Sequence, residues 1–482
     1  MKDYLRYEDF GAKGDGITDD FASIIACHNA ANESGIPVKT DPDATYYIGG
    51  CGESAIIKTD VDFGTSKFII NDIKLEDIKS YVFVIASDNQ HFDPEIKTLK
   101  KGQKHIDMPK KGRFFVKVFN DERLIFIRKG LNKNIGTATT DCFTVDENGS
   151  IFPTVDWDYP TVTRATAVSI DDKPITVRGG IFTTIANREE SFYNYHHRGF
   201  IVKRSNVTIS DMTHYVEGEG DHGAPYHGFI RTKYAVNVTI RNCLLTARFI
   251  YRTASKIPGK DVPMGSYDLS FDSSIDVRCE NIRQTIDITD SRYWGIYTSN
   301  FCKNLSLVNC SLSRFDAHQG VSNVYIKDCE FGHQAMNLIG FGEAVIENTV
   351  IRANSAINLR SDYGAIWDGT VTMRNCKLIP NSKSASIIST RNRGDHDFGY
   401  ICTMPHTVDI RGFVLDDSGI GGADNFTVLS AYDPEYSEGK PYAYVPVNTL
   451  SICGITTVSG TAVTPLGSDE QYKGTTVNIL EE

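Results

Sequence analysis

The phrase NVTISDM, residues 206–212, returns as NVTIRNC at residues 237–243, and this repetition decides the fold. Apolar and polar residues alternate within the phrase, which is the period of a β-strand that buries one face. An Asn, Asp or Cys often ends the phrase, where the chain bends toward the next strand. The series continues with SIDVRCE from Ser274, NLSLVNC from Asn304, NVYIKDC from Asn323, EAVIENT from Glu343, TVTMRNC from Thr370 and TVDIRGF from Thr407.

The spacing of the phrases indicates stacked coils. The step from Asn304 to Asn323 is 19 residues, and that from Thr370 to Thr407 is 37. A core coil of about twenty residues with rim loops of variable length explains such steps. An antiparallel sandwich would show evenly spaced hairpin dipeptides, and a leucine-rich solenoid would show fixed leucines. Neither pattern is present, so we predict an all-β fold, a right-handed parallel β-helix.

The N-terminal stretch YEDFGAKGDGITDDFASIIACHNAANESG predicts one helix over residues 21–34. Thr18 is placed to cap this helix, Asp19 and Asp20 suit its first turn, and Gly35 ends it. The open end of a solenoid exposes strand edges and apolar side chains. We therefore expect the helix to lie across that end.

Residues 88–163 interrupt the repeats. The turn pairs Asn120-Asp121 and Asn148-Gly149 stand between alternating segments, which predicts an inserted antiparallel β-region. Such a region either forms a wall that contacts carbohydrate or packs as an appendage, and we favour packing. The expected divisions are 1–87 for the N-terminal cap and first coils, 88–163 for the insertion, 164–431 for the main β-helix and 432–482 for a C-terminal cap.

Composition excludes several classes of function. The net charge of -11 gives no general attraction to nucleic acid or to an anionic membrane. The N-terminus MKDYLRYEDF lacks the apolar core of a signal peptide, which leaves the location open between cytoplasmic and exported with its leader removed. Eleven cysteines without CxxC pairs fit buried thiols better than disulfides. No Walker or Rossmann motif appears, so we expect no cofactor and no metal.

The segment FGAKGDGITDD, residues 10–20, resembles the opening motif of the pectate lyase-like superfamily. That superfamily includes family 28 glycoside hydrolases, β-helical glucanases and phage tailspike depolymerases. The resemblance implies a parallel β-helix that acts on polysaccharide. The chain departs from the polygalacturonases of family 28, because no DD pair or RIK stands in the corresponding region.

The segment SLSRFDAHQG, residues 311–320, carries the densest candidate chemistry. Arg314, Asp316 and His318 alternate with Phe315 and Ala317, so we expect the charged trio to be exposed on one face of a strand. The phrase FDAH also resembles the YGFDPH signature of β-helical mannuronan epimerases. That resemblance implies catalytic roles for the aspartate and the histidine.

Alignment of neighbouring coils through Asn304 and Asn323 places Tyr297 beside Asp316 and Ser299 beside His318. Carboxylate pairs suit glycoside hydrolysis, whereas His or Tyr beside Arg suits removal of a proton α to a substrate carboxylate. The candidate catalytic residues are Asp316, His318, Tyr297, Asp290 and Asp362. The candidate substrate-binding residues are Arg292, Arg314, Arg360, Asp368, His222, His227, Arg252 and Lys256.

The glycine-rich segment VEGEGDHGAPYHG, residues 216–228, is predicted to be a loop that overhangs the strand face carrying these candidate residues. His222 and His227 in this segment suit substrate contact. In the next loop, Arg252 and Lys256 add positive charge for an acidic sugar. Taken together, the features predict an enzyme that cleaves glycosidic bonds of a polysaccharide, as a glycoside hydrolase or a polysaccharide lyase. A uronate epimerase and a tailspike-like glycan-binding protein are the alternatives, and the expected assembly is a monomer or a homotrimer.

Overall fold

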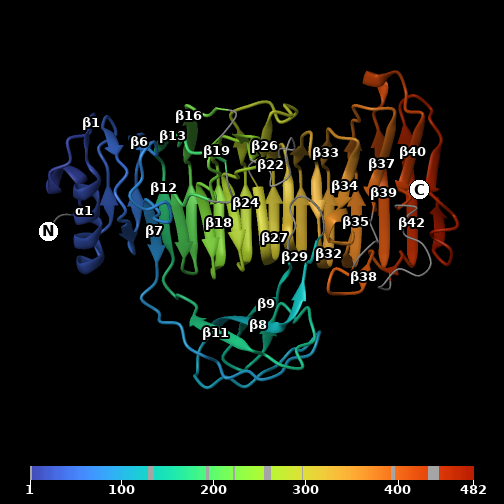
Figure 1. Cartoon of the computed structure of the whole chain (residues 1–482), viewed down its shortest axis with the longest axis horizontal. Helices are drawn as coiled ribbons and strands as arrows, with labels where there is room; N and C mark the ends of the chain where they lie inside the picture. The colour runs from blue at the N-terminus through green and yellow to red at the C-terminus, as the bar shows by residue number, and fades with distance from the viewer. Residues whose placement is uncertain are drawn as a thin grey trace. The chain divides into compact units, whose positions relative to one another are not determined.

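The computed structural model describes residues 3–128, 135–191, 195–220, 223–253, 262–295, 297–391, 397–432 and 444–481. The chain divides into two compact units. The first unit comprises Met1–His91 and Val168–Thr298, and the second comprises Phe92–Ala167 and Ser299–Glu482. Both units consist of stacked parallel strands, so the chain is a right-handed parallel β-helix, as the repeats predict (Figure 1).

The predicted helix is present as α1 (Phe21–Ser34), which ends at Gly35 in the left-handed conformation. The predicted cap is wrong, because Thr18 lies in strand β1 (Asp15–Asp19) and the helix N-cap is Asp20. The carboxylate of Asp20 instead accepts hydrogen bonds from backbone N–H groups of the preceding loop at 2.6 and 3.1 Å. This carboxylate therefore orders the loop that leads into the first strand.

Helix α1 covers the first strands of the unit, as expected. The side-chain amide of Asn32 donates to the carbonyl of Ile56 at 2.8 Å and accepts from the N–H of Lys58 at 2.9 Å. Ile56 lies in strand β4 (Ala55–Ile57), so the amide satisfies backbone groups that a missing neighbouring strand would otherwise take.

Three parallel ladders build the first unit. The first ladder contains β1, β3 (Thr45–Ile48), β6 (Lys67–Asn71), β13 (Ile181–Ile185), β16 (Thr213–Glu217), β19 (Leu244–Leu245) and β25 (Arg283–Gln284). The second contains β4, β7 (Phe83–Ala86), β14 (Phe200–Lys203), β17 (Ile230–Lys233) and β23 (Leu269–Asp272). The third contains β2 (Val38–Lys39), β5 (Val61–Asp62), β12 (Ile175–Arg178), β15 (Val207–Ser210), β18 (Val236–Arg241) and β24 (Ile275–Glu280). Short antiparallel pairs join β20 (Arg248–Phe249) to β26 (Tyr293–Gly295) and β21 (Tyr251–Thr253) to β22 (Val262–Met264).

The coils of the second unit also stack in parallel. Its longest ladder contains β27 (Tyr297–Val308), β29 (Phe315–Lys327), β32 (Gly340–Glu347), β35 (Trp367–Arg374), β39 (Thr407–Leu415), β42 (Thr449–Thr457) and β44 (Thr476–Leu480). A ladder of short strands contains β28 (Ser311–Leu312), β30 (Glu330–Phe331), β33 (Val350–Ile351) and β36 (Lys377–Leu378). The start of β29 opens another ladder with β31 (Met336–Leu338), β34 (Ser355–Leu359), β37 (Ser384–Ser389), β40 (Asn425–Leu429) and β43 (Val463–Leu466). We call this last ladder the groove sheet.

The sequence predicts that the repeats fade after about Tyr432. This prediction is wrong, because parallel strands continue beyond that residue. Strand β42 pairs in parallel with β39, and β44 pairs with β42. Leu450 and Ile452 continue the alternation on β42 and are buried, which keeps the strand in the stack. The divisions expected at residues 87, 163 and 431 remain predictions.

The Asn and Asp residues that end the phrases lie at the bends, as the sequence predicts. Asp211, Asn242 and Asn281 all adopt positive φ, between 55° and 60°. Asn242 donates to Asp211 at 3.1 Å, and Asn281 donates to Asn242 at 2.9 Å. Short polar side chains tolerate the left-handed conformation, and here they also bond from coil to coil.

The inserted antiparallel β-region contains β8 (Phe114–Ile125), β9 (Thr137–Val145), β10 (Ile151–Phe152) and β11 (Arg164–Ser169), in the order β10-β9-β8-β11. Figure 1 labels β8, β9 and β11 of this region. The predicted turn at Asn148-Gly149 joins β9 to β10, and Gly149 has φ of 80°. The turn predicted at Asn120-Asp121 is wrong, because β8 continues through it with a shift of register before Leu124. The Asp121 carboxylate binds the guanidinium of Arg164 at 2.7 Å.

The cysteines behave as the sequence predicts. All eleven are free thiols, and nine of them are buried. In the parts of the chain that the structure describes, no helix is both long and apolar enough to cross a bilayer. Nor do those parts gather three His, Cys, Asp or Glu side chains at a point where they could hold a metal ion.

Candidate functional site

The segment that carries Arg314, Asp316 and His318 begins strand β29, and both faces of this part of the strand are buried. Phe315 and Ala317 are fully covered, and so is Asp316, with an exposed fraction of 0%. Arg314 retains 6%. The predicted exposure is therefore wrong for Arg314 and Asp316, because the arginines that neutralise the Asp316 carboxylate also cover it, whereas His318 is half-buried.

A β-bulge places His318. Ser299 pairs with Ala317, but the next residue, Asn300, pairs with Gln319. His318 is thus the extra residue of β29, and the predicted pairing of Ser299 with His318 is wrong by one position. A bulge re-aims one side chain out of the regular alternation, which alternation in sequence alone does not reveal.

The imidazole of His318 is neutral near pH 7. Burial, assisted by the guanidinium groups of Arg360 and Arg128, lowers its pKa to about 4, against the opposing effect of nearby carboxylates. Its Nδ1 lies 3.2 Å from Oδ1 of Asn300. A neutral imidazole beside positive charge is chemically able to accept a proton.

Five side chains form a continuous ion network in this part of the second unit. Asp316 accepts from Arg314 at 2.8 Å through one oxygen and from Arg360 at 2.8 Å through the other. Arg360 also donates twice to Asp362, at 3.1 and 3.2 Å. Arg128, from the inserted region, binds the same Asp362 carboxylate at 2.9 Å. The network ties the inserted region to the coils and holds three guanidinium groups in fixed positions.

The turn that carries Asp362 is held rigidly. It forms the short helix η2 (Ser361–Tyr363) directly after β34. The guanidinium carbons of Arg128 and Arg360 each lie 5.3 Å from the centre of the Tyr363 ring, within cation–π range. Tyr400 donates from its hydroxyl to the Tyr363 carbonyl at 2.5 Å.

The Asp362 carboxylate keeps its charge well into acid. Burial alone would raise its pKa, but Arg360 and Arg128 outweigh burial and lower the pKa to about 2. Because the folded pKa lies below the ordinary value, the ion pairs stabilise the fold above about pH 4 and lose that contribution as the pH falls toward 2. The side chain is 37% exposed, so solvent screening limits the contribution to about 1 kcal/mol.

We therefore expect Asp362→Asn to lose about 1 kcal/mol of unfolding free energy at neutral pH and almost nothing at pH 2. Urea unfolding of both proteins between pH 2 and 6 measures the difference. A difference that stays constant across this range would contradict the ion-pair origin.

An open groove of about 670 Å³ lies on the groove sheet of the second unit. Hydroxyl, amide and guanidinium groups dominate its lining, and Asp362 is its one carboxylate among the described residues. The lining residues are Arg314, Asn337, Asn354, Ser355, Asn358, Leu359, Arg360, Ser361, Asp362, Ser382, Ser384, Ala385, Ser386, Ser389, Arg391, Asn425, Thr427, Ser430, Ala431 and Gly467.

Strand register aligns the polar side chains into columns along the groove. Asp316 pairs with Asn337, which pairs with Asn358, which pairs with Ser389. Neighbouring coils lie about 4.8 Å apart. Beyond the buried Asp316, the members of this column line the groove and offer hydrogen-bonding groups at regular intervals to a chain molecule laid along the coils.

The residues predicted from the sequence to bind substrate do not include these serines and asparagines. They stand in short segments such as SAINL and SASIIS, where polar residues are interspersed with buried apolar ones. Neutral polar residues carry no strong signal of chemistry, so only their stacking in register identifies them.

Other predicted catalytic residues lie elsewhere. The predicted outward orientation of Tyr297 is wrong, since it is 1% exposed and packs edge-on against Phe271 within the first unit, with ring centres 5.2 Å apart. Asp290 and Arg292, also in the first unit, bind each other across a turn at 2.5 Å. This ion pair is a local contact on the surface of the turn.

The remaining predicted binding residues fall into three groups. Asp368, on β35 of the second unit, is held by Lys101 at 2.5 Å and by His406 at 2.8 Å, and it does not line the groove. His222, Lys256 and the side chain of Arg252 lie outside the described residues. His227 belongs to the first unit, where its ring contacts those of Tyr195 and His197.

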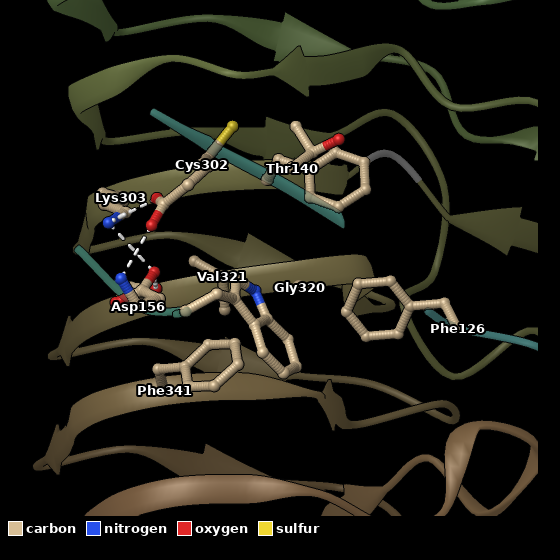
Figure 2. Close-up of a pocket in the computed structure, with 12 residues that line it drawn as sticks. Phe126, Thr140, Asp156, Cys302, Lys303, Gly320, Val321 and Phe341 are labelled. Atoms are coloured by element: carbon tan, nitrogen blue, oxygen red, sulfur yellow. Dashed lines mark hydrogen bonds and ion pairs between the residues drawn. The ribbon is translucent and has the colours of Figure 1, made fainter. Parts of the chain in front are cut away.

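A buried ion triad joins the inserted region to the coils of the second unit (Figure 2). The ammonium of Lys303, 2% exposed, lies 2.7 Å from Asp141 and 3.0 Å from Asp156, and it donates to the carbonyl of Thr154 at 2.7 Å. Ser322 donates to Asp156 at 2.5 Å. The adjacent cavity measures only about 20 Å³, room for about one water, so this contact is structural.

The fold and the groove define a parallel β-helix protein with an open polar groove across stacked coils. No protein-family model and no curated protein matches the chain in sequence. Several solved structures share the fold. The tailspike gp61 of Pseudomonas phage phi297 is 12% identical, with a TM-score of 0.55, and the match covers 99% of this chain and 84% of the tailspike.

Two further tailspikes are similar in fold. The Gp54 tailspike of Acinetobacter baumannii bacteriophage AP22, determined in complex with A. baumannii capsular saccharide, is 11% identical, with a TM-score of 0.53 and coverage of 99% and 79%. The tailspike gp49 of Pseudomonas phage LKA1 is 13% identical, with a TM-score of 0.51 and coverage of 94% and 81%. These likenesses establish the parallel β-helix fold.

Proposed function

We propose that the chain is a carbohydrate-active protein of the pectate lyase-like superfamily that binds a polysaccharide along the groove sheet and cleaves its glycosidic bonds. The observation that carries the proposal is the alignment of hydroxyl and amide side chains across the coils, in a groove that is also lined by a carboxylate paired with two arginines. Sugars present hydroxyl groups at regular intervals, which such columns match. The AP22 tailspike, bound to a capsular saccharide, supports this substrate class.

Asp362 is the proposed reacting carboxylate. With a pKa of about 2 it is ionised at neutral pH, as a nucleophile or a general base in hydrolysis must be. Arg314 and Arg360 would bind the sugar beside it. Asp316 acts as a positioning residue, because its fully buried carboxylate binds both arginines.

Proton abstraction from a uronate is the second candidate chemistry. The neutral imidazole of His318, with a pKa of about 4, favours it, because a base must be unprotonated to act. An arginine beside it would neutralise the substrate carboxylate, as β-elimination and epimerisation both require.

The test is a panel of neutral and acidic polysaccharides, read for new reducing ends and for the ultraviolet absorbance of unsaturated products. Reducing ends alone indicate hydrolysis, absorbance indicates elimination, and altered sugar composition without cleavage indicates epimerisation. If the chain binds a polysaccharide but causes none of these changes, it is a glycan-binding protein and the proposed cleavage is overturned.

A groove-blocking variant tests the location. Asn358→Trp places a bulky ring in the groove, and we expect affinity for the responsive polysaccharide to fall at least about tenfold. Thr372→Trp is the matched control, since Thr372 lies on β35, outside the groove lining, and is similarly half-buried. Equal affinity of the two variants would place the binding site elsewhere.

A further inference from the structure

A second concentration of charge lies in the first unit, around Arg231. This arginine stands on β17, in register with Ile201 of β14 and Ser270 of β23. Its guanidinium donates to the hydroxyl of Tyr81 at 3.0 Å and lies 3.4 Å from the Asp272 carboxylate. The side chain is 7% exposed and is thus held in place, with part of its charge already balanced by Asp272.

Aromatic rings adjoin this guanidinium. Tyr81 stacks on His197 with ring centres 4.9 Å apart, and His197 meets His227 edge to face at 4.8 Å. The ring of Tyr195 lies 5.0 Å from that of His227. Both histidines and Tyr195 are half-buried, so part of each ring remains accessible.

Three lysines add to the charge. Lys79 donates to the carbonyl of Tyr195 at 2.7 Å, which holds its ammonium beside the rings. Lys233 follows Arg231 on β17 by two residues and so projects from the same face. Lys203 ends β14, the neighbouring strand. We call Lys79, Lys203, Arg231 and Lys233, with His197, His227 and Tyr195, the first-unit basic cluster.

The cations of this cluster repel one another. Burial, then Lys233 and Arg231, lower the pKa of Lys203. Burial, together with Arg231 and Lys79, lowers the pKa of His197 to about 4 and that of His227 to about 2. A bound anion would relieve this repulsion, which is a source of binding free energy that a neutral ligand cannot use.

We propose that the first-unit basic cluster binds an acidic saccharide, with the anionic group on Arg231 and the lysines and a sugar face against the half-buried rings. Guanidinium groups bind carboxylates in two-pronged geometry, and aromatic faces pack against the C–H face of a sugar. The net charge of -11 opposes a long polyanion such as nucleic acid, whose affinity depends on a broad basic field. This site is additional to the groove of the second unit and does not depend on the function proposed for it.

Calorimetric titration of the full chain tests the proposal. The probes are an oligogalacturonate, its carboxyl-reduced form and a chondroitin sulfate oligosaccharide, and the Asn358→Trp background removes the contribution of the groove. We expect at least one acidic probe to bind, affinity to fall with added salt, and the reduced form to bind at least about tenfold more weakly.

Three variants locate the site. Arg231→Gln should weaken binding at least about tenfold, and Lys203→Gln with Lys233→Gln should weaken it about threefold to tenfold without lowering the thermal midpoint, because repulsion is relieved. Arg278→Gln is the control, since Arg278 lies on β24 of the same unit and pairs with Glu280. The proposal is overturned if no acidic probe binds, if all variants bind like the control, or if a DNA oligomer of equal charge binds as tightly.

Discussion

Lys303→Met is expected to lower the unfolding free energy of the second unit by about 3–5 kcal/mol. The substitution keeps most of the volume but removes the one cation between Asp141 and Asp156. Asp141 is 2% exposed, so its carboxylate would be left buried beside a second carboxylate. Chemical denaturation followed by circular dichroism measures the loss.

Two variants identify the cause of this loss. Lys327→Met changes a half-buried lysine on β29 of the same unit and should stay within about 0.5 kcal/mol of the parent. Adding Asp141→Asn to Lys303→Met should recover part of the stability, because one uncompensated charge disappears. No recovery would mean that packing, and not charge, accounts for the loss.

The triad also has a pH signature. Burial, only partly opposed by Lys303, raises the pKa of Asp141 to about 6. A raised carboxyl pKa means that the folded state holds an extra proton between about pH 4 and 6, so the contribution of Asp141 to stability falls as the pH rises through that window. The deficit of Lys303→Met should accordingly be smallest near pH 4.

The second large effect separates Asp316 from Asp362. Asp316→Asn is expected to cost about 3 kcal/mol of unfolding free energy, because two largely buried arginines lose their shared counter-charge. Asp362→Asn should cost only about 1 kcal/mol, yet lower turnover on a responsive polysaccharide by about 10²–10⁴-fold. Parallel unfolding curves and rate assays distinguish the two effects.

Asp368→Asn is the matched control for turnover. Asp368 is a carboxylate of the same unit that binds Lys101 and His406, but it does not line the groove. Its substitution should leave turnover within about twofold of the parent. Full turnover in Asp362→Asn would show that Asp362 is not the reacting carboxylate. The second candidate chemistry, proton abstraction by His318, would then be favoured.

The features predicted well are those that local sequence encodes. Alternation and recurrence of the phrases predicted strands such as β15 and β18, and Gly35 marked the end of α1. Strand periodicity and turn preference act over a few residues, so one segment carries the whole signal. The misplaced cap at Thr18 and the missed continuation after Tyr432 lie at boundaries, where that signal is weakest.

The sequence grouped several residues that the structure brings into contact, but it did not predict the geometry of their contacts. Arg314, Asp316, Arg360 and Asp362 do come together, yet Asp316 and Arg314 are buried and a bulge shifts His318 by one position. A bulge adds one residue to one strand and leaves no mark on composition.

By itself the sequence determined a coiled all-β fold, its capping helix and an antiparallel insertion, because each depends on the pattern of neighbouring residues. Only the tertiary structure decided which polar residues line a groove, which are buried ion partners and which form the first-unit basic cluster. Lys303 and Asp141 are far apart in sequence, as are His197 and Tyr81. The environment of each depends on which coil or inserted strand covers it, and that is settled by long-range packing.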